Sequence, residues 1–339
     1  MQSESGIQKM NKRYDVLGVG IAAVDDLLYV AEYPPSDCKI PVSGSVRQGG
    51  GPACTAMATV GTMGGRAAYV ARFGRNELSN YISSSLELRG VDTSHIVYDP
   101  TGGPYHSVIV VDREGHRNVF YDPALYRAVT AEDLSETLIR STKLVLLDHI
   151  TDPSLAPAAR KIRNLGVPIM ADIEGHTESA IELVEFADYL VVSASFATWM
   201  SKESDPRAAC SSLAAVRRSA TVVTDGQNGC YLCTSAGRSA RHFPAFQVNA
   251  FDTNGCGDTF HGAFAFAIAR NADVEHAIVF ASAAAALKAT AAGGKRRGWE
   301  AIPTRDEVLD FLRTRLDEPA RSSILKQLHL LLEPTNPVQ

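Results

Sequence analysis

The chain has 339 residues, of which 45% are hydrophobic and 21% are charged. That is enough apolar material for one large α/β domain or two smaller ones, and the chain is too long for a small disulfide-held module. The 33 basic and 38 acidic residues give a net charge of -5. Nucleic-acid binding requires a basic excess that is missing here, so small soluble substrates are expected.

The N-terminal stretch MQSESGIQKM lacks the apolar segment of a signal peptide, and Lys288 interrupts the Ala-rich run 281–292. We therefore expect a cytoplasmic protein without a membrane span. The six cysteines are too few for a disulfide framework in a chain of this length. Cys230 and Cys233 form a C-x-x-C pair, but on a predicted strand they point to opposite faces, which argues against a redox or zinc site.

Short apolar runs predict buried strands along the chain, at residues 14–20, 144–147, 168–171, 189–192 and 221–223. Helical patterns separate these runs. Such alternation predicts an α/β fold with a mostly parallel central sheet and helices on both faces. Ligands of such sheets bind at the carboxyl ends of the strands. Asp148, Asp172 and Glu174 follow strand ends, so they are candidate substrate or metal ligands.

Two segments break the alternation. Residues 26–48 contain the strand-like LLYVAEY, and residues 105–121 read as two strands joined by a turn at 112–115. We expect them to form a small β-sheet lid that excludes water during chemistry and opens to release product. Exposed edges of a lid sheet favour pairing with a second copy, so a homodimer is a hypothesis. Helically spaced apolar residues in 316–339 predict a C-terminal helical extension.

The run AFDTNGCGDTFHGAF, residues 250–264, carries the strongest functional signal. Gly255, Cys256 and Gly257 leave backbone N–H groups uncovered at the start of a predicted buried helix over 259–270, where the helix dipole also favours anions. Asp258 can accept the proton of an alcohol that attacks phosphorus. The simpler interpretation is that Asp258 caps the helix and the glycines form a turn, and this run alone does not decide between the two.

Further glycine-rich and acidic positions precede or follow predicted elements. Gly49 and Gly50 precede Pro52, which suits the first turn of a helix. Asp25 follows the first strand and suits hydrogen bonding to sugar hydroxyls, with a plain turn residue as the alternative. The loop TDGQNG, residues 224–229, can lie along the phosphates and ribose of a nucleotide. The sequence has no G-x-x-x-x-G-K-[ST] motif, so a nucleotide would be held without a P-loop.

A dehydrogenase is a competing interpretation, because GVGIAA at residues 18–23 imitates the dinucleotide-binding pattern G-x-G-x-x-A. That pattern requires a helix immediately after it. The chain instead continues with a strand-like run that ends at Pro34 and Pro35, which stop a helix. The sequence therefore argues against a nicotinamide cofactor.

The order and spacing of these motifs resemble the PfkB, or ribokinase-like, carbohydrate kinases over residues 14–315. The resemblance implies a parallel sheet with a β lid, ATP as phosphate donor with Mg²⁺, and a sugar or sugar derivative whose hydroxyl receives the γ-phosphate. It implies Asp258 as general base and the amides of Gly255, Cys256 and Gly257 as an anion hole. The remaining implied contacts are the sugar ligands Asp25, Gly49, Gly50, Cys54, Asp148 and His106, the nucleotide ligands Thr224, Gly226, Gly229, Ser282 and Gly293, and Asp252 and Asn254 for a monovalent cation such as K⁺.

The chain also departs from the family pattern. Cys54 stands where a sugar-binding Asn is usual and cannot replace the donor and acceptor of an amide, so sugar recognition must differ. The run SASF, residues 193–196, offers no carboxylate where an N-x-x-E motif would organise Mg²⁺. Cys256 takes the usual Ala place in the anion hole. The acceptor stays open, and a nucleoside kinase or a catalytically silent sugar or nucleotide sensor on the same fold are the alternatives.

Overall fold

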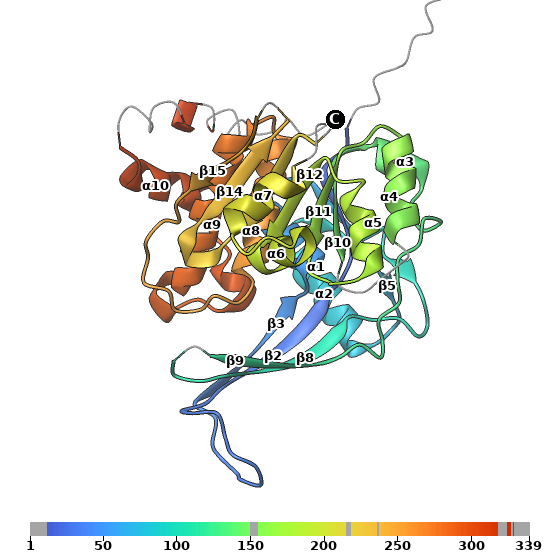
Figure 1. The fold of residues 1–339 in the computed structure, drawn as a ribbon. Coiled ribbons are helices and arrows are strands. Elements are labelled where there is room, and N and C mark those ends of the chain that lie inside the picture. Colours follow the sequence, from blue (N-terminus) through green and yellow to red (C-terminus); the bar gives the residue numbers. More distant parts are fainter. Residues whose placement is uncertain are drawn as a thin grey trace, which may run out of the picture.

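The central element of the molecule is a large twisted sheet (Figure 1). The computed structural model describes residues 12–114, 116–149, 155–214, 218–235, 237–317, 324–326 and 328. Within them, the strands of this sheet follow the order β15 (Gly237–Phe243), β14 (Cys230–Thr234), β13 (Ala220–Thr224), β12 (Tyr189–Ser193), β11 (Ile169–Ile173), β10 (Thr142–His149), β1 (Tyr14–Val19), β4 (Ala67–Val70) and β6 (Val91–Asp92). Every pair from β6 to β13 is parallel, and β14 and β15 add an antiparallel edge.

The parallel strands are apolar because both of their faces are covered. All residues of β1 and β11 are buried, as expected for parallel strands that lie between two helix layers. The predicted strands correspond to β1, β10, β11, β12 and β13, whereas β4 and β6 were not predicted. Both are short, and β4 carries only the run AAYV, which has no alternation that distinguishes it from a helix segment.

The two helix layers are distinguished by the sheet residues that they cover. Leu144 and Leu146 face one layer, and Val145 and Leu147 face the other. The first layer contains α1 (Pro52–Thr62), α2 (Glu77–Glu87), α8 (Cys256–Ala269), α9 (Val274–Gly294) and α10 (Arg305–Arg315). The second contains α3 (Glu136–Arg140), α4 (Leu155–Asn164), α5 (Glu178–Val184), α6 (Ala194–Ser201) and α7 (Pro206–Leu213). The predicted α/β architecture is therefore confirmed.

Helices α8 and α9 pack against each other in the interior of the first layer. Most residues of α8 are buried, which confirms the buried helix predicted over 259–270. Among the described helices, α9 alone is long and apolar enough to cross a membrane by length and composition. However, 56% of its apolar window is buried inside the protein, as is typical of a core helix.

A second, four-stranded sheet projects from one end of the molecule (Figure 1). Its order is β3 (Gly44–Gly50), β2 (Ala23–Tyr29), β8 (Tyr105–Val111) and β9 (Arg117–Asp122). We call this sheet the lid. The predicted hairpin over 105–121 corresponds to β8 and β9, which pair antiparallel. In the other lid segment, β2 begins at Ala23 and ends at Tyr29, so Asp25 lies within a strand and not in a turn. The strands β5 (Arg72–Phe73) and β7 (Val97–Tyr98) form a separate short pair.

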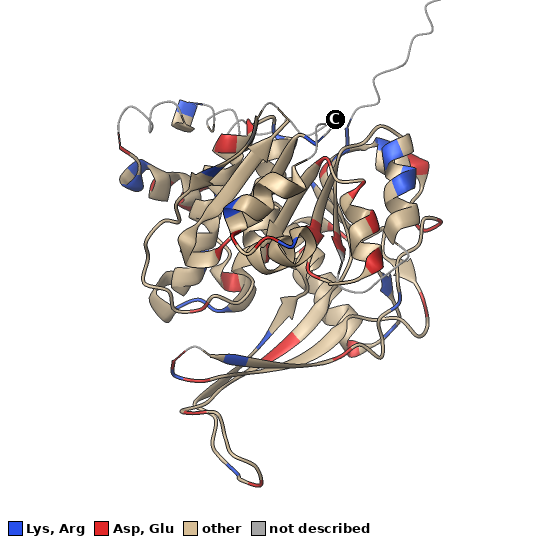
Figure 2. Cartoon of the chain, viewed as in Figure 1, with Lys and Arg blue, Asp and Glu red and all other residues tan. Residues whose placement is uncertain are grey.

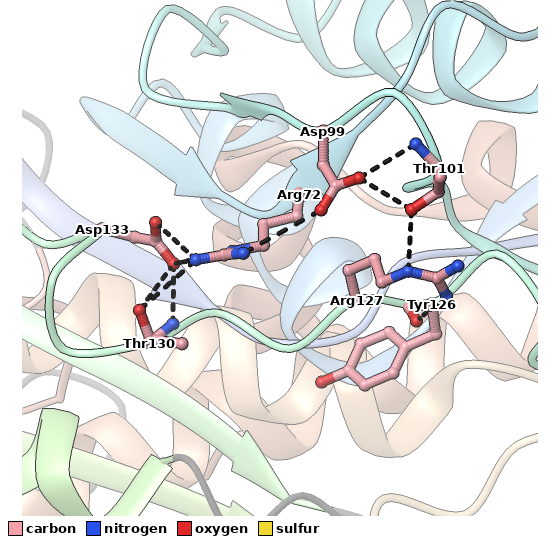
Figure 3. Close-up of polar contacts among 7 residues, drawn as sticks. All are labelled: Arg72, Asp99, Thr101, Tyr126, Arg127, Thr130 and Asp133. Carbon is pink, nitrogen blue, oxygen red and sulfur yellow. Dashed lines mark hydrogen bonds and ion pairs between the residues drawn. The ribbon is translucent and has the colours of Figure 1, made fainter.

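Residues 123–133, which follow the lid strand β9, are held by a polar network (Figure 3). The guanidinium of Arg72 donates to both carboxylate oxygens of Asp133, at 2.8 and 2.9 Å. Arg127 donates from Nε to the Thr101 hydroxyl at 3.0 Å and from Nη1 to the Tyr126 carbonyl at 2.7 Å. Because Tyr126 packs edge-on against Tyr105 in β8, the network holds this segment against the base of the lid.

The two cysteines of the C-x-x-C pair lie as the sequence predicted. Cys230 packs in the first helix layer and Cys233 in the second, so the two thiols lie on opposite faces of β14, as predicted. All six cysteines are free.

Figure 2 shows basic and acidic residues on both the sheet domain and the lid. Most of the predicted extension 316–339 lies outside the described residues, but Ile324, Leu325 and Leu328 pack on the first layer.

Candidate active site

The start of α8 provides backbone donors that are free to bind an anion. Gly255 is the N-cap, with a left-handed φ of 71°, and no side chain caps the helix. The N–H groups of Gly255 and Gly257 have no acceptor among the described residues, whereas the Cys256 N–H donates to the Thr253 carbonyl at 3.3 Å. The predicted anion hole is therefore available at Gly255 and Gly257, and the Cys256 amide is already occupied.

Asp258 lies in the first turn of α8 and lines a cavity of about 560 Å³ together with Gly255 and Gly257. Burial, and then the negative charges of Asp172 and Glu174, raise the pKa of Asp258 to about 7. A carboxylate with such a pKa accepts a proton at neutral pH far better than an ordinary aspartate. Gly255, which has no side chain, is the N-cap of α8, and the role of Asp258 as general base stays a prediction.

The opposite wall of the cavity is formed by the lid. Its lining residues include Ala23, Asp25, Gln48, Gly49, Gly50, Tyr105, Ser107, Ile109, Arg117, Val119 and Tyr121. Asp25 is only 8% exposed. Burial raises its pKa, while hydrogen bonds with Ser107 and Gln48 act in the opposite direction. A buried carboxylate that lines a cavity in this way suits the recognition of hydroxyl groups.

The glycines of β3 make room for other cavity residues. A Cβ on Gly50 would lie 2.2 Å from Oδ2 of Asp25, and a Cβ on Gly49 would lie 2.4 Å from the Trp299 ring. Trp299 itself lines the cavity and donates from Nε1 to the Thr55 hydroxyl at 3.1 Å. The sequence assigned these glycines to close approach of a ligand. In the structure they line the cavity and also allow Asp25 and Trp299 to reach it.

Three residues expected to contact the sugar do not line this cavity. Asp148 is 1% exposed and accepts from the Ile21 and Ala53 amides at 2.9 and 2.8 Å, so it joins the turn before the lid to the start of α1. Cys54 is completely buried in α1. His106 bonds from Nε2 to Asp26 at 2.8 Å. Neighbouring residues of a strand face opposite ways, so His106 lies on the other face of the lid from Tyr105 and Ser107.

The comparisons with known proteins agree with this geometry. The model of the pfkB family carbohydrate kinases matches residues 15–301. The chain belongs to this family. It is therefore a phosphotransferase that acts on an alcohol group, and it has the ribokinase-like fold.

Individual pfkB relatives are distant. The chain is 25% identical to a probable fructokinase-5 of Arabidopsis thaliana over 79% of this chain and 88% of that protein. It is 26% identical to an ATP-dependent ribose-1-phosphate kinase of Halopiger xanaduensis, over 89% and 99%. A putative ribokinase structure from Agrobacterium tumefaciens has 31% identity and a TM-score of 0.77, covering 92% of this chain and 98% of that one. A putative ribokinase II structure from E. coli in complex with ATP and Mg²⁺ has 18% identity, a TM-score of 0.74 and coverages of 88% of this chain and 99% of that one, so it supports the fold alone.

The residues that the pfkB pattern assigns to the nucleotide lie away from the cavity wall. Thr224 ends β13 and donates from its hydroxyl to the Val192 carbonyl at 3.3 Å. Gly226 begins a short 3-10 helix (Gly226–Asn228), and Gly229, with a φ of 95°, begins the return into β14. Ser282 and Gly293 both belong to α9. None of these residues lines the cavity of Asp258, and their role in nucleotide binding stays a prediction.

A cluster of possible metal ligands, two carboxylates and one histidine, lies at Asp258. Ligand atoms of Asp172, Asp258 and His261 lie within 4.8 Å of one another. Oδ2 of Asp172 is buried and accepts no hydrogen bond among the described residues, although Nδ1 of His261 lies 3.2 Å away. Glu174 lines the cavity. Carboxylate oxygens are the ligands that Mg²⁺ prefers, so this donor set fits the metal. The strand end after β11 was the signal that identified Asp172 and Glu174 in the sequence.

His261 was missed by sequence reasoning, because it lies in the middle of an apolar helical run. It is 5% exposed. Its Nδ1 lies 2.8 Å from the Gly257 carbonyl and 3.2 Å from Oδ2 of Asp172, and its Nε2 lies 3.0 Å from the Val191 carbonyl. The ring therefore connects the first turn of α8 to the ends of two central strands, and its charge lowers the pKa of Asp258, against the effects of burial and of the neighbouring carboxylates.

Asp252 and Asn254, which were predicted to hold a monovalent cation, have different contacts in the structure. The Asn254 amide donates to Oδ1 of Asp252 at 2.9 Å, which leaves Oδ2 of Asp252 buried without a hydrogen-bond partner among the described residues. That free oxygen is suited to a cation. The carbonyl of Asn254, in contrast, already accepts from Nζ of Lys288 at 2.8 Å.

Proposed function

We propose that this pfkB protein is an ATP-dependent kinase that transfers the γ-phosphate to a hydroxyl of a sugar or sugar derivative. The observation that carries the proposal is the single cavity that joins Asp258 and the free amides of Gly255 and Gly257 to polar groups of the lid. Phosphoryl transfer needs positioning, charge stabilisation and one proton acceptor, and this cavity offers all three.

In the proposed reaction the acceptor binds under the lid, with Asp25, Gln48 and Ser107 available to its hydroxyl groups. The reacting hydroxyl oxygen forms a bond to the γ-phosphorus while the bond to the leaving ADP oxygen breaks, and the hydroxyl proton moves to the Asp258 carboxylate. The amides of Gly255 and Gly257 stabilise the charge of the transferring group. Such stabilisation is strongest where water is excluded, as it would be with the lid closed over the bound acceptor.

ATP and Mg²⁺ would approach from the sheet side of the cavity. Asp172 and Glu174 would hold Mg²⁺, which when bound supplies positive charge to the phosphate oxygens. Thr224, Gly226 and Gly229 would contact the phosphates and ribose of ATP, and Ser282 and Gly293 would flank the adenine. The chain would then need no P-loop.

The lid also supports a hypothesis about assembly. Its outer strand β9 exposes Val119, Phe120 and Tyr121 at 49%, 55% and 63%, and β9 is an edge strand. An exposed apolar edge favours pairing with a second copy, so we infer a homodimer through the lid. Light scattering of the purified chain would test this, and a monomer at all concentrations would contradict it. The cytoplasmic location expected from the sequence is a separate prediction.

The function is tested with the full chain, ATP and Mg²⁺ against sugars, sugar acids, sugar phosphates and nucleosides, with release of ADP as the readout and the product mass as confirmation. Asp258→Asn should lower kcat by about 10²- to 10⁴-fold. The control is Asp205→Asn, because Asp205 caps α7 and an Asn can replace that cap. The proposal fails if no acceptor is phosphorylated or if Asp258→Asn keeps the wild-type kcat.

A further inference from the structure

Lys288 is a buried cation that faces the active-site cavity. It belongs to α9, is 1% exposed, and is among the largest fully buried side chains of the described chain. It lines the cavity of Asp258. Its ammonium makes one hydrogen bond, to the Asn254 carbonyl at 2.8 Å, and forms no ion pair with any described carboxylate.

A buried ammonium without an ionic partner is costly, because the interior cannot replace the hydration that the charge loses. An ammonium has three N–H donors, and only one of those of Lys288 is used. Among the cavity-lining residues the acidic ones are Asp25, Glu174 and Asp258, and the basic ones are Arg117, on the lid, and Lys288. Lys288 is therefore the fixed positive charge on the side of the cavity that carries the anion hole.

The turn of α9 that contains Lys288 also holds residues 251–254, which lead into the anion hole. The carbonyl of Ala289 accepts from the amides of Phe251 and Asp252, at 2.7 and 3.0 Å. Lys288 then binds the carbonyl of Asn254, which immediately precedes Gly255. Both ends of residues 251–254 are thus attached to α9, and the Asn254 carbonyl belongs to the same peptide group as the Gly255 N–H.

We propose that Lys288 is a positioning residue that acts as the built-in monovalent cation of the phosphoryl-transfer site. Its ammonium holds the Asn254 carbonyl and thereby keeps the Gly255 and Gly257 amides directed into the cavity. This role rests on the kinase activity proposed above. It differs from the expectation that K⁺ is held by Asp252 and Asn254, because the lysine already occupies the Asn254 carbonyl and the wild-type chain then needs no added cation there.

The test compares Lys288→Ala with the wild type in buffers whose only monovalent cation is tetramethylammonium, which is too large for the space left by the side chain. Lys288→Ala should lower kcat by about 10²- to 10³-fold, the loss typical of a disturbed anion hole, with KM for the acceptor changed by less than about threefold. Added NH₄⁺ should restore the variant by at least about tenfold in a saturable way and leave the wild type unchanged. Lys288→Met, which fills the space without a charge, should stay inactive with or without NH₄⁺.

Lys161→Ala is the matched control. Lys161 also donates to a backbone carbonyl, that of Ala131 at 2.8 Å, but it lies in α4 and lines no part of the cavity. Its removal should leave kcat and the response to NH₄⁺ unchanged. The proposal is overturned if Lys288→Met retains the wild-type kcat, if NH₄⁺ does not restore Lys288→Ala, or if the wild type itself requires K⁺ or NH₄⁺.

Thermal unfolding separates this proposal from the proposed activity. NH₄⁺ should raise the Tm of Lys288→Ala by mass action and leave the Tm of the wild type and of Lys161→Ala unchanged. That shift is expected whether or not an acceptor sugar has been found, so a wild type without kinase activity would contradict the function and not the cation site. An unchanged Tm of Lys288→Ala in NH₄⁺ would contradict the cation site directly.

Discussion

Asp258→Asn should make the protein more stable at the same time as it removes activity. The difference between an ordinary aspartate pKa of 3.8 and the Asp258 pKa of about 7 corresponds to about 4 kcal/mol at ~1.36 kcal/mol per pKa unit. That free energy opposes folding whenever the side chain is ionised in the folded state. An Asn has the same shape and no charge, so the variant avoids it.

The pH dependence of this destabilisation follows from the different affinities of the folded and unfolded chains for the Asp258 proton. Above pH ~7 the carboxylate is ionised in both the folded and the unfolded chain, and the full destabilisation is present. As the pH falls toward ~4, the folded state takes up a proton first and the destabilisation disappears. The stability gain of Asp258→Asn should therefore be largest at pH 8 and absent below pH ~4.

Chemical denaturation at pH 8 and pH 5 measures the unfolding free energy of Asp258→Asn against that of the wild type, and thermal unfolding is the second measure. For 339 residues at ~2.1 cal/mol/K per residue, the melting entropy is about 0.7 kcal/mol/K, so 4 kcal/mol raises Tm by about 6 °C. A variant that is less stable than the wild type at pH 8, or whose gain is the same at both pH values, would refute the assignment of Asp258 as a carboxylate with a raised pKa.

Other substitutions test separate parts of the site and the fold. Glu174→Gln removes a charge that raises the pKa of Asp258 and also one of the two proposed Mg²⁺ ligands. At saturating Mg²⁺, kcat should fall at every pH, and the acid limb of the kcat/KM profile should move to lower pH by up to about one unit. The control is Glu178→Gln, in the exposed first turn of α5, and an unmoved limb would contradict the coupling. Gly50→Ala places a Cβ 2.2 Å from Asp25, so the rise in KM for the acceptor should be larger than the fall in kcat. The control Gly237→Ala meets nothing within 4 Å and should leave both constants unchanged. Equal kinetics of the two variants would exclude Asp25 from acceptor binding. Asp15→Asn removes a buried carboxylate that pairs with Arg66, Lys143 and Arg270. Burial raises the pKa of Asp15, but these partners lower it to about 2, so the variant should lose about 3 kcal/mol of unfolding free energy at pH 7. In denaturant titrations the difference from the wild type should shrink as the pH falls from about 4 toward 2.

Local patterns in the sequence identified the groups whose placement depends on local structure. Gly255 and Asp258 could be assigned because a left-handed glycine and a helix start are encoded within a few residues. Asp172 and Glu174 followed from the rule that strand ends meet at one edge of a parallel sheet. In each case the predicted role required no knowledge of which distant segment lies opposite.

Groups whose role depends on distant segments could not be predicted. Trp299 reaches the cavity only because Thr55, far away in the chain, fixes its indole nitrogen. Asp148 follows a strand end like Asp172, yet its carboxylate is used by the Ile21 and Ala53 amides. His106 and Tyr105 are neighbours in sequence, and only the register of the lid determines which of them faces the ligand.

The cavity is built from two walls with independent origins in the sequence. One wall comes from α8, α9 and the strand ends, and the other comes from the lid strands β2, β3, β8 and β9. Under the proposed function, substitutions in the lid would change which molecule is accepted and leave the residues that handle phosphate in place. Exchange of lid strands between members of such a fold offers a route to new acceptor specificities without redesign of the chemistry, and natural divergence can follow the same route.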